Sequence, residues 1–159
     1  MARSERRHRR QRVREAPAPR YSPPPRGKGV AGILLDSDVV IEILRGPAKV
    51  AADLLAIEAH GLPTYCYAIA WAEVAAGLWP GEETITENFF HDRGDVVIDA
   101  ETGRRAGAYL SRYARSHGVE IADALVGAAA STAGLHLWTL NRKHSPMDDL
   151  RLYEPGPGR

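Results

Sequence analysis

The chain has 159 residues and a formal net charge of +1, and this length is typical of one domain. Hydrophobic residues make up 44% and charged residues 26%, which is an ordinary composition for a soluble domain with one core. No apolar run approaches the ~18 residues of a membrane span, and a single cysteine, Cys66, excludes an internal disulfide framework and a cysteine-based zinc site. We therefore expect a cytoplasmic protein.

Charge divides the sequence into two unlike segments. Residues 1–29 hold 10 Lys/Arg against 2 Glu, a balance of +8, whereas residues 30–159 hold 11 Lys/Arg against 18 Asp/Glu, a balance of −7. The first segment is rich in Arg and Pro and poor in large apolar residues, so we expect it to be disordered. It is a basic arm that contacts nucleic-acid phosphates, a solvated tail or the product of a mis-assigned start codon. We expect the folded domain over residues 30–154 and a flexible C-terminus over 155–159.

Apolar runs alternate with helical periodicity along the folded part. In chain order we predict a strand at 30–36, helices at 37–46 and 47–61, a strand at 62–67, helices at 68–78 and 82–93, a strand at 95–99, helices at 101–117 and 122–133, a strand at 135–140 and a short fifth strand at 150–153. Strands that alternate with helices pair in parallel, so we predict a three-layer α/β fold whose central parallel sheet of four or five strands is flanked by helices. Ligands bind such sheets at the carboxyl ends of the strands.

Three acidic residues stand in largely apolar surroundings. Asp36 ends the first apolar run, where it either belongs to a binding site or caps the next helix. Glu73 has small or apolar neighbours one helical turn away, so it is either a site residue or a single exposed glutamate. Asp123 lies in the first turn of a helix of small residues, where it complements the helix dipole or contributes to a site.

We predict that these three acids converge at the carboxyl edge of the sheet. Carboxylates that lie close together repel each other unless a cation joins them. Hard oxygen ligands favour Mg²⁺ or Mn²⁺, which also engage phosphate groups. Such an ion activates water and stabilises the charge of a phosphodiester displacement, so the three acids favour a metal site that acts on phosphate esters.

Four segments, taken together, resemble a PIN domain and, more narrowly, the VapC-type toxins of bacterial toxin–antitoxin pairs. They are ILLDSDVVIEILRG, AWAEVAAG, IADALVGAAA and LWTLNRKHSPMDDLRL, and separations of 37, 50 and 18 residues divide positions 36, 73, 123 and 141. The resemblance covers residues 30–154 and excludes the tail. It implies a parallel sheet flanked by helices, RNA cleavage with Mg²⁺ or Mn²⁺ held by acidic residues, and a cognate VapB-like antitoxin.

The same resemblance assigns roles to residues of this chain. The implied catalytic residues are Asp36, Glu73, Asp123 and Asn141. Asp36 and Asp123 would hold the metal ion, and Glu73 would orient or deprotonate the attacking water. Asn141 stands where the family often has Asp, so the number of ions, one or two, is open. Auxiliary positions are the acids Asp38 and Glu120 and the hydroxyl of Thr139, and weak RNA contacts are expected from Arg45, Arg142 and Lys143.

Two other functions stay open at this point. One is a PIN-like protein that binds RNA or a partner without cutting, which the uncharged Asn141 favours. The other is a haloacid-dehalogenase-type phosphatase, because LLDSDVV fits the opening motif of those enzymes. Their later Thr, Lys and acidic pair would have to be Thr139, Lys143 and Asp148-Asp149, which are crowded into 11 residues.

The sequence also predicts a homodimer. Trp79, Phe89 and Phe90 would give more exposed aromatic surface than a small monomer usually presents. The resemblance implies dimers as well. Neither the RNA substrate nor the antitoxin can be named from the sequence.

Overall fold

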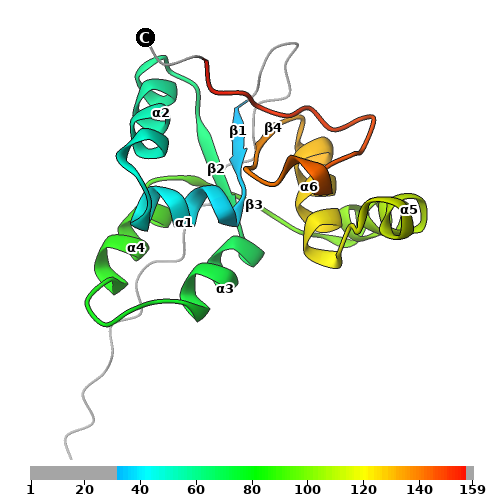
Figure 1. Ribbon diagram of the computed structural model, residues 1–159, viewed down its shortest axis with the longest axis horizontal. Coiled ribbons are helices and arrows are strands. Elements are labelled where there is room, and N and C mark those ends of the chain that lie inside the picture. The colour runs from blue at the N-terminus through cyan, green and yellow to red at the C-terminus, as the bar shows by residue number, and fades with distance from the viewer. Residues whose placement is uncertain (1–31, 157–159) are drawn as a thin grey trace, which may run out of the picture.

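Four short parallel strands form the centre of the structure, a computed structural model that describes residues 32–156 (Figure 1). The strands are β1 (Ile33–Leu35), β2 (Thr64–Tyr67), β3 (Gly94–Val96) and β4 (His136–Trp138), in the order β3-β2-β1-β4. Every pairing is parallel, which confirms the predicted α/β fold with a central parallel sheet. The predictions for the tail at 1–29 and for residues 157–159 lie outside the described residues.

Helices cover both faces of the sheet, so the domain has three layers (Figure 1). Within residues 32–156 the helices are α1 (Ser37–Arg45), α2 (Ala48–Ala59), α3 (Ala68–Ala76), α4 (Glu83–His91), α5 (Ala100–His117), α6 (Ile121–Ala133) and the 3₁₀ turn η1 (Arg142–His144). Figure 1 shows α1 to α4 gathered on one side and α5 and α6 on the other. In this part of the chain, no helix combines the length and the apolar character that crossing a membrane requires.

Two glycines explain where the last two long helices end. Gly118 and Gly134 have φ values of +65° and +68°, a left-handed conformation that residues with a Cβ atom rarely adopt. At the other end of α5, Asp99 Oδ1 accepts a hydrogen bond from the Thr102 amide at 2.9 Å. These caps are local signals, which is why the helix ends follow the sequence closely.

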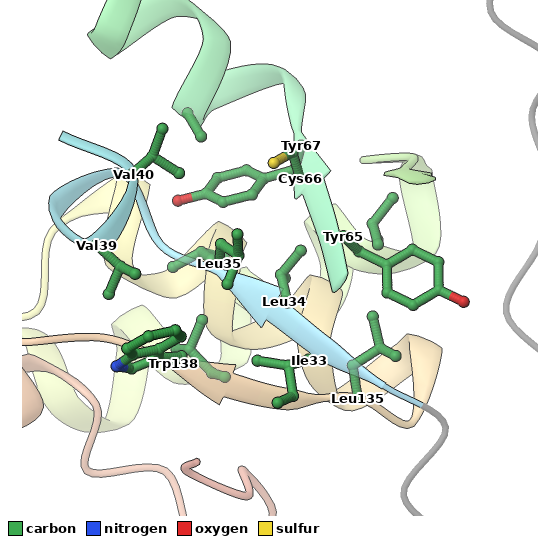
Figure 2. Close-up of a cluster of buried hydrophobic side chains, with 14 of the residues drawn as sticks. Ile33, Leu34, Leu35, Val39, Val40, Tyr65, Cys66, Tyr67, Leu135 and Trp138 are labelled. Atoms are coloured by element: carbon green, nitrogen blue, oxygen red, sulfur yellow. The ribbon is translucent and has the colours of Figure 1, made fainter. Parts of the chain in front are cut away.

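The core is centred on β1, whose side chains are covered on both faces (Figure 2). Ile33, Leu34 and Leu35 are all 0% exposed. A strand covered on both faces has no polar position, so its sequence is a continuous apolar run instead of an alternating one. Cys66 lies in the neighbouring strand, and its burial raises the pKa of the thiol to about 12. The thiol is therefore protonated at neutral pH and is no nucleophile.

The strands in the structure are shorter than predicted, and the reason is visible at two of them. β3 ends at Val96 and not at residue 99, because Asp99 leaves the sheet to cap α5. The predicted fifth strand at 150–153 is a single parallel bridge between Leu152 and Leu137. A single bridge needs one pair of residues to align, whereas a strand needs several consecutive pairs.

The predicted exposed aromatic face is wrong for Phe90. Phe90 is 3% exposed and stacks on Trp71, with ring centroids 4.1 Å apart. The buried face of α4 consists of Thr86 and Phe90, four residues apart, so this helix turns Phe90 toward the core. Phe89 is half-buried, and Trp79 alone of the three is largely exposed, at 70%.

Candidate active site

The carboxyl ends of the strands border a cleft of about 120 Å³. The side chains that give this cleft its polar character are Asp36, Asp38, Tyr67, Glu73, Asp123 and Asn141. The cleft thus brings together all four residues to which the resemblance assigned catalysis. Tyr67 is a member that the sequence argument did not name, although it is the last residue of β2 and so occupies a strand end where ligands are expected.

Asp36 is both a helix cap and a cleft residue. Its Oδ1 atom accepts hydrogen bonds from the Ser37 amide at 2.8 Å and from the Tyr67 hydroxyl at 2.7 Å. Within residues 32–156 no hydrogen bond engages the Oδ2 atom of Asp36. Burial, and then the Asp36 charge, raise the pKa of the Tyr67 hydroxyl, so Tyr67 stays a hydrogen-bond donor. One oxygen of Asp36 is therefore fixed and the other is free for a ligand.

Asp38 ties α1 to the turn that follows β4. Its Oδ2 atom accepts hydrogen bonds from the Thr139 hydroxyl at 3.2 Å and from the amides of Leu140 and Asn141, each at 3.0 Å. Its Oδ1 atom is buried and has no hydrogen-bond partner in the described part of the chain. Burial, and then the charge of Asp36, raise the pKa of Asp38 against the lowering effect of these hydrogen bonds.

Asp123 is held by its own helix. Its Oδ2 atom accepts a hydrogen bond from the Glu120 amide at 2.8 Å, and the Glu120 side chain accepts one from the Asp123 amide. This reciprocal pair is a capping box, which stabilises the start of α6. Glu120, predicted as an auxiliary acid, therefore serves as the helix cap and does not line the cleft.

Glu73 and Asn141 complete the cleft in different ways. Glu73 is exposed on α3, and no hydrogen bond within residues 32–156 engages its carboxylate. The side-chain Nδ2 of Asn141 lies 3.0 Å from Nδ1 of His144. His144 Nδ1 also lies 3.7 Å from Asp123 Oδ2. The sequence argument missed His144, although it follows Asn141 by three residues in the same motif.

Two of the three predicted RNA-contact residues are already engaged at the surface. Arg45 pairs with Glu82 and donates a hydrogen bond to the Gly77 carbonyl at 2.7 Å. Arg142 pairs with Glu154. Lys143 forms no ion pair with any residue of the described range 32–156. Contacts from these residues to RNA remain a prediction.

The acidic pair required by the phosphatase alternative lies elsewhere. Asp149 pairs with Arg105 and accepts a hydrogen bond from the Tyr109 hydroxyl on α5. Asp148 pairs with Arg112 on the same helix. These contacts tie the C-terminal segment to α5, and neither aspartate lines the cleft. The haloacid-dehalogenase arrangement is therefore wrong.

The donor set of the cleft fits a hard divalent cation. Residues 32–156 contain no ready-made cluster of three His, Cys, Asp or Glu side chains that could hold an ion. Four carboxylates nevertheless line one cleft, and the buried Oδ1 of Asp38 has no hydrogen-bond partner among these residues. A buried charged oxygen without a partner is costly, and a bound cation would relieve that cost. Carboxylate and amide oxygens are the ligands that Mg²⁺ and Mn²⁺ prefer.

Comparison with known proteins agrees with the fold. The sequence profile of the PIN domain matches residues 33–150. A chain of FitAcB from Neisseria gonorrhoeae is 27% identical with a TM-score of 0.59, and the alignment covers 77% of this chain and 97% of that one. A toxin–antitoxin complex from Klebsiella pneumoniae is 20% identical with a TM-score of 0.60, and the alignment covers 75% of this chain and 95% of that one. VapBC2 from Rickettsia felis, bound to a DNA fragment from its promoter, is 21% identical with a TM-score of 0.61. That alignment covers 76% of this chain and 96% of the other. No curated protein matches the sequence.

Proposed function

The chain belongs to the PIN domain family, and we propose that it is a metal-dependent endoribonuclease that acts as the toxin of a toxin–antitoxin pair. The observation that carries the proposal is the single cleft lined by Asp36, Asp38, Glu73 and Asp123. The toxin–antitoxin complex from Klebsiella pneumoniae, which shares the fold, supports the biological role.

Asp36 and Asp123 are the proposed ligands of a Mg²⁺ or Mn²⁺ ion. Hydrogen bonds within the described residues leave Asp36 Oδ2 unengaged, and they hold Asp123 through Oδ2 only. Asp38 adds a buried oxygen that has no hydrogen-bond partner in the described part of the chain. A bound ion supplies positive charge, which lowers the pKa of water and stabilises the charge that develops on the phosphate.

The remaining side chains have distinct tasks in this proposal. The Tyr67 hydroxyl holds Asp36 Oδ1 and so fixes the direction of the other oxygen. Glu73 is exposed and has no hydrogen bond to another described residue, so it can accept a proton from the attacking water. Thr139 keeps Asp38 turned toward the loop after β4. Preorganised ligands and one mobile base are what a hydrolytic phosphodiester cleavage needs.

The negative charge of the cleft affects the binding of both RNA and the antitoxin. Residues 30–159 carry a balance of −7, which disfavours broad contact with a polyanion. We propose that Arg45, Arg142 and Lys143, or the tail at 1–29, hold the RNA. A VapB-like antitoxin would inhibit by placing a basic side chain among the carboxylates, because that charge competes with the cation.

A homodimer is part of the same proposal. Trp79 is 70% exposed, and burying an indole of this size in an interface is a common source of binding energy. Light scattering at micromolar concentration should give the mass of a dimer, and Trp79→Ser should shift it toward the monomer. A monomer for the parent chain would refute this part.

The test of the enzymatic proposal is cleavage of a panel of transfer, ribosomal and messenger RNAs by the purified chain. Cleavage in the presence of Mg²⁺ or Mn²⁺ is expected to stop with EDTA and with Asp123→Asn. RNA binding without cleavage in either metal would favour the non-catalytic alternative, for which the uncharged Asn141 is the supporting observation. Equal cleavage by the parent and by Asp123→Asn would place the activity outside this cleft.

A further inference from the structure

Asn141 is held at two points, through its backbone amide and through its side-chain amide. Its backbone amide donates hydrogen bonds to Asp38 Oδ2 at 3.0 Å and to Thr139 Oγ1 at 3.1 Å. Its side-chain amide has a separate partner, with Nδ2 at 3.0 Å from Nδ1 of His144. The backbone bonds fix where Asn141 sits, and the side-chain bond fixes which way its amide is turned.

The orientation matters because an amide has one oxygen and one nitrogen. Only the oxygen of Asn141 can coordinate a cation, and the NH₂ group would repel one. A carboxylate needs no such control because its two oxygens are equivalent. With Asn at this position, a hydrogen-bond acceptor that engages the NH₂ group would leave the oxygen for the cation.

His144 is the acceptor that the structure provides. Nδ1 can accept from Asn141 when the ring carries its proton on Nε2. The alternative partner of Nδ1, Asp123 Oδ2, lies 3.7 Å away, which is too long for a hydrogen bond. That oxygen also already accepts a hydrogen bond from the Glu120 amide. The Asn141 amide is thus the hydrogen-bond partner of Nδ1.

We infer that His144 is a positioning residue that turns the Asn141 oxygen toward a divalent cation in the cleft. This inference rests on the proposed metal site but not on RNA as the substrate. Partners that orient metal ligands typically contribute 10- to 100-fold to metal affinity. For a neutral ligand such as Asn141 we expect an effect of about tenfold, at the lower end of that range.

The experiment measures Mg²⁺ affinity of the full chain by calorimetry, together with thermal unfolding without metal. His144→Ala should raise the Kd for Mg²⁺ about tenfold. His144→Asn should stay within about threefold of the parent, because the Asn oxygen can occupy the place of Nδ1. His91→Ala is the matched control, since His91 is exposed on α4 and does not line the cleft.

A double-mutant cycle separates positioning from a merely structural role. In the Asn141→Asp background, His144→Ala should change the Kd less than about twofold, because a carboxylate needs no orientation. An equal loss in both backgrounds would overturn the inference, as would an unchanged Kd in His144→Ala. If the parent binds Mg²⁺ and the cycle behaves as expected but no RNA is cleaved, the proposed function fails and the inference stands. If the parent binds no divalent ion, the inference fails.

Discussion

The two sides of the cleft hold their carboxylates in opposite ways. On the side of α1, Asp36 and Asp38 accept hydrogen bonds from an adjacent amide, a buried phenol and the turn after β4. On α3, by contrast, Glu73 is exposed and without a hydrogen bond in residues 32–156. A fixed carboxylate is suited to hold a cation, whereas a free one can take up and release a proton. The contrast predicts that substitutions on the fixed side weaken both metal binding and cleavage, whereas substitution of the free carboxylate lowers the cleavage rate alone.

The largest effect is expected on the fixed side. Asp36→Asn keeps the side-chain shape but removes the charge of a proposed metal ligand. Several kcal/mol of transition-state stabilisation depend on the ion, so single-turnover RNA cleavage should fall at least about 10³-fold. The increase in melting temperature that Mg²⁺ produces should disappear as well. Asp92→Asn, an exposed change at the end of α4, is the control. Parental cleavage by Asp36→Asn would contradict the division of roles.

Substitution of the free carboxylate, Glu73, should lower the cleavage rate without weakening Mg²⁺ binding. Glu73→Gln removes a proton acceptor, and general bases typically contribute 10²–10⁴-fold, so we expect cleavage to fall about 10²-fold. The Kd for Mg²⁺ should stay within about twofold of the parent, because Glu73 is not assigned as a ligand. Calorimetry and single-turnover cleavage measure the two quantities separately. A matching loss of Mg²⁺ affinity would show that Glu73 is a ligand and would break the comparison.

A smaller effect is expected from the phenol that supports Asp36. Tyr67→Phe removes the 2.7 Å hydrogen bond to Asp36 Oδ1 and little else. Hydrogen bonds to charged groups contribute about 1.5–3 kcal/mol, so cleavage should fall about tenfold or more, with a parallel rise in the Kd for Mg²⁺. Tyr65→Phe is the matched control on the same strand, because Tyr65 does not line the cleft. If Tyr67→Phe cleaves like Tyr65→Phe, Asp36 is fixed by other contacts.

The order of elements could be predicted because its signals are local. Apolar runs, Asp caps and the glycines at 118 and 134 mark strands and helices without reference to the rest of the fold. The fifth strand and the exposure of Phe90 could not be predicted in this way. The first depends on register against β4, and the second on which face of α4 meets Trp71. Both are set by partners distant in sequence.

Some residues of the candidate site could likewise be predicted from local sequence, and others could not. The acids at 36, 73 and 123 stand out because their sequence surroundings are apolar. The contacts that orient them do not stand out. In the sequence, Tyr67 cannot be distinguished from other aromatic residues of a strand, and His144 cannot be distinguished from other polar residues of a basic loop. Their contribution depends on distances to Asp36 and Asn141 that only the folded chain defines.

The smallest expected effect concerns the cost of the fixed side when no metal is bound. Asp38 lies near the charge of Asp36 and has one buried oxygen without a hydrogen-bond partner in residues 32–156. Asp38→Asn keeps an oxygen for the three hydrogen bonds from residues 139–141 and removes the charge. Burial and the Asp36 charge both disfavour the charged form of Asp38. Metal-free Asp38→Asn should therefore unfold above the parent, and a gain of about 1 kcal/mol would raise the melting temperature by about 3 °C.

Added Mg²⁺ should reverse that order of stability. The parent gains stability from the ion because Asp38 presents a negative oxygen to it, whereas the amide of Asp38→Asn does not. Melting curves across a Mg²⁺ titration should therefore cross, with the variant more stable at zero Mg²⁺ and the parent more stable at saturation. Asp53→Asn, at an ion pair with Lys49 on α2, should show no such crossing. Parallel curves for Asp38→Asn and the parent would mean that the Asp38 charge has no part in binding the ion, and the cation would then be held by Asp36 and Asp123 without it.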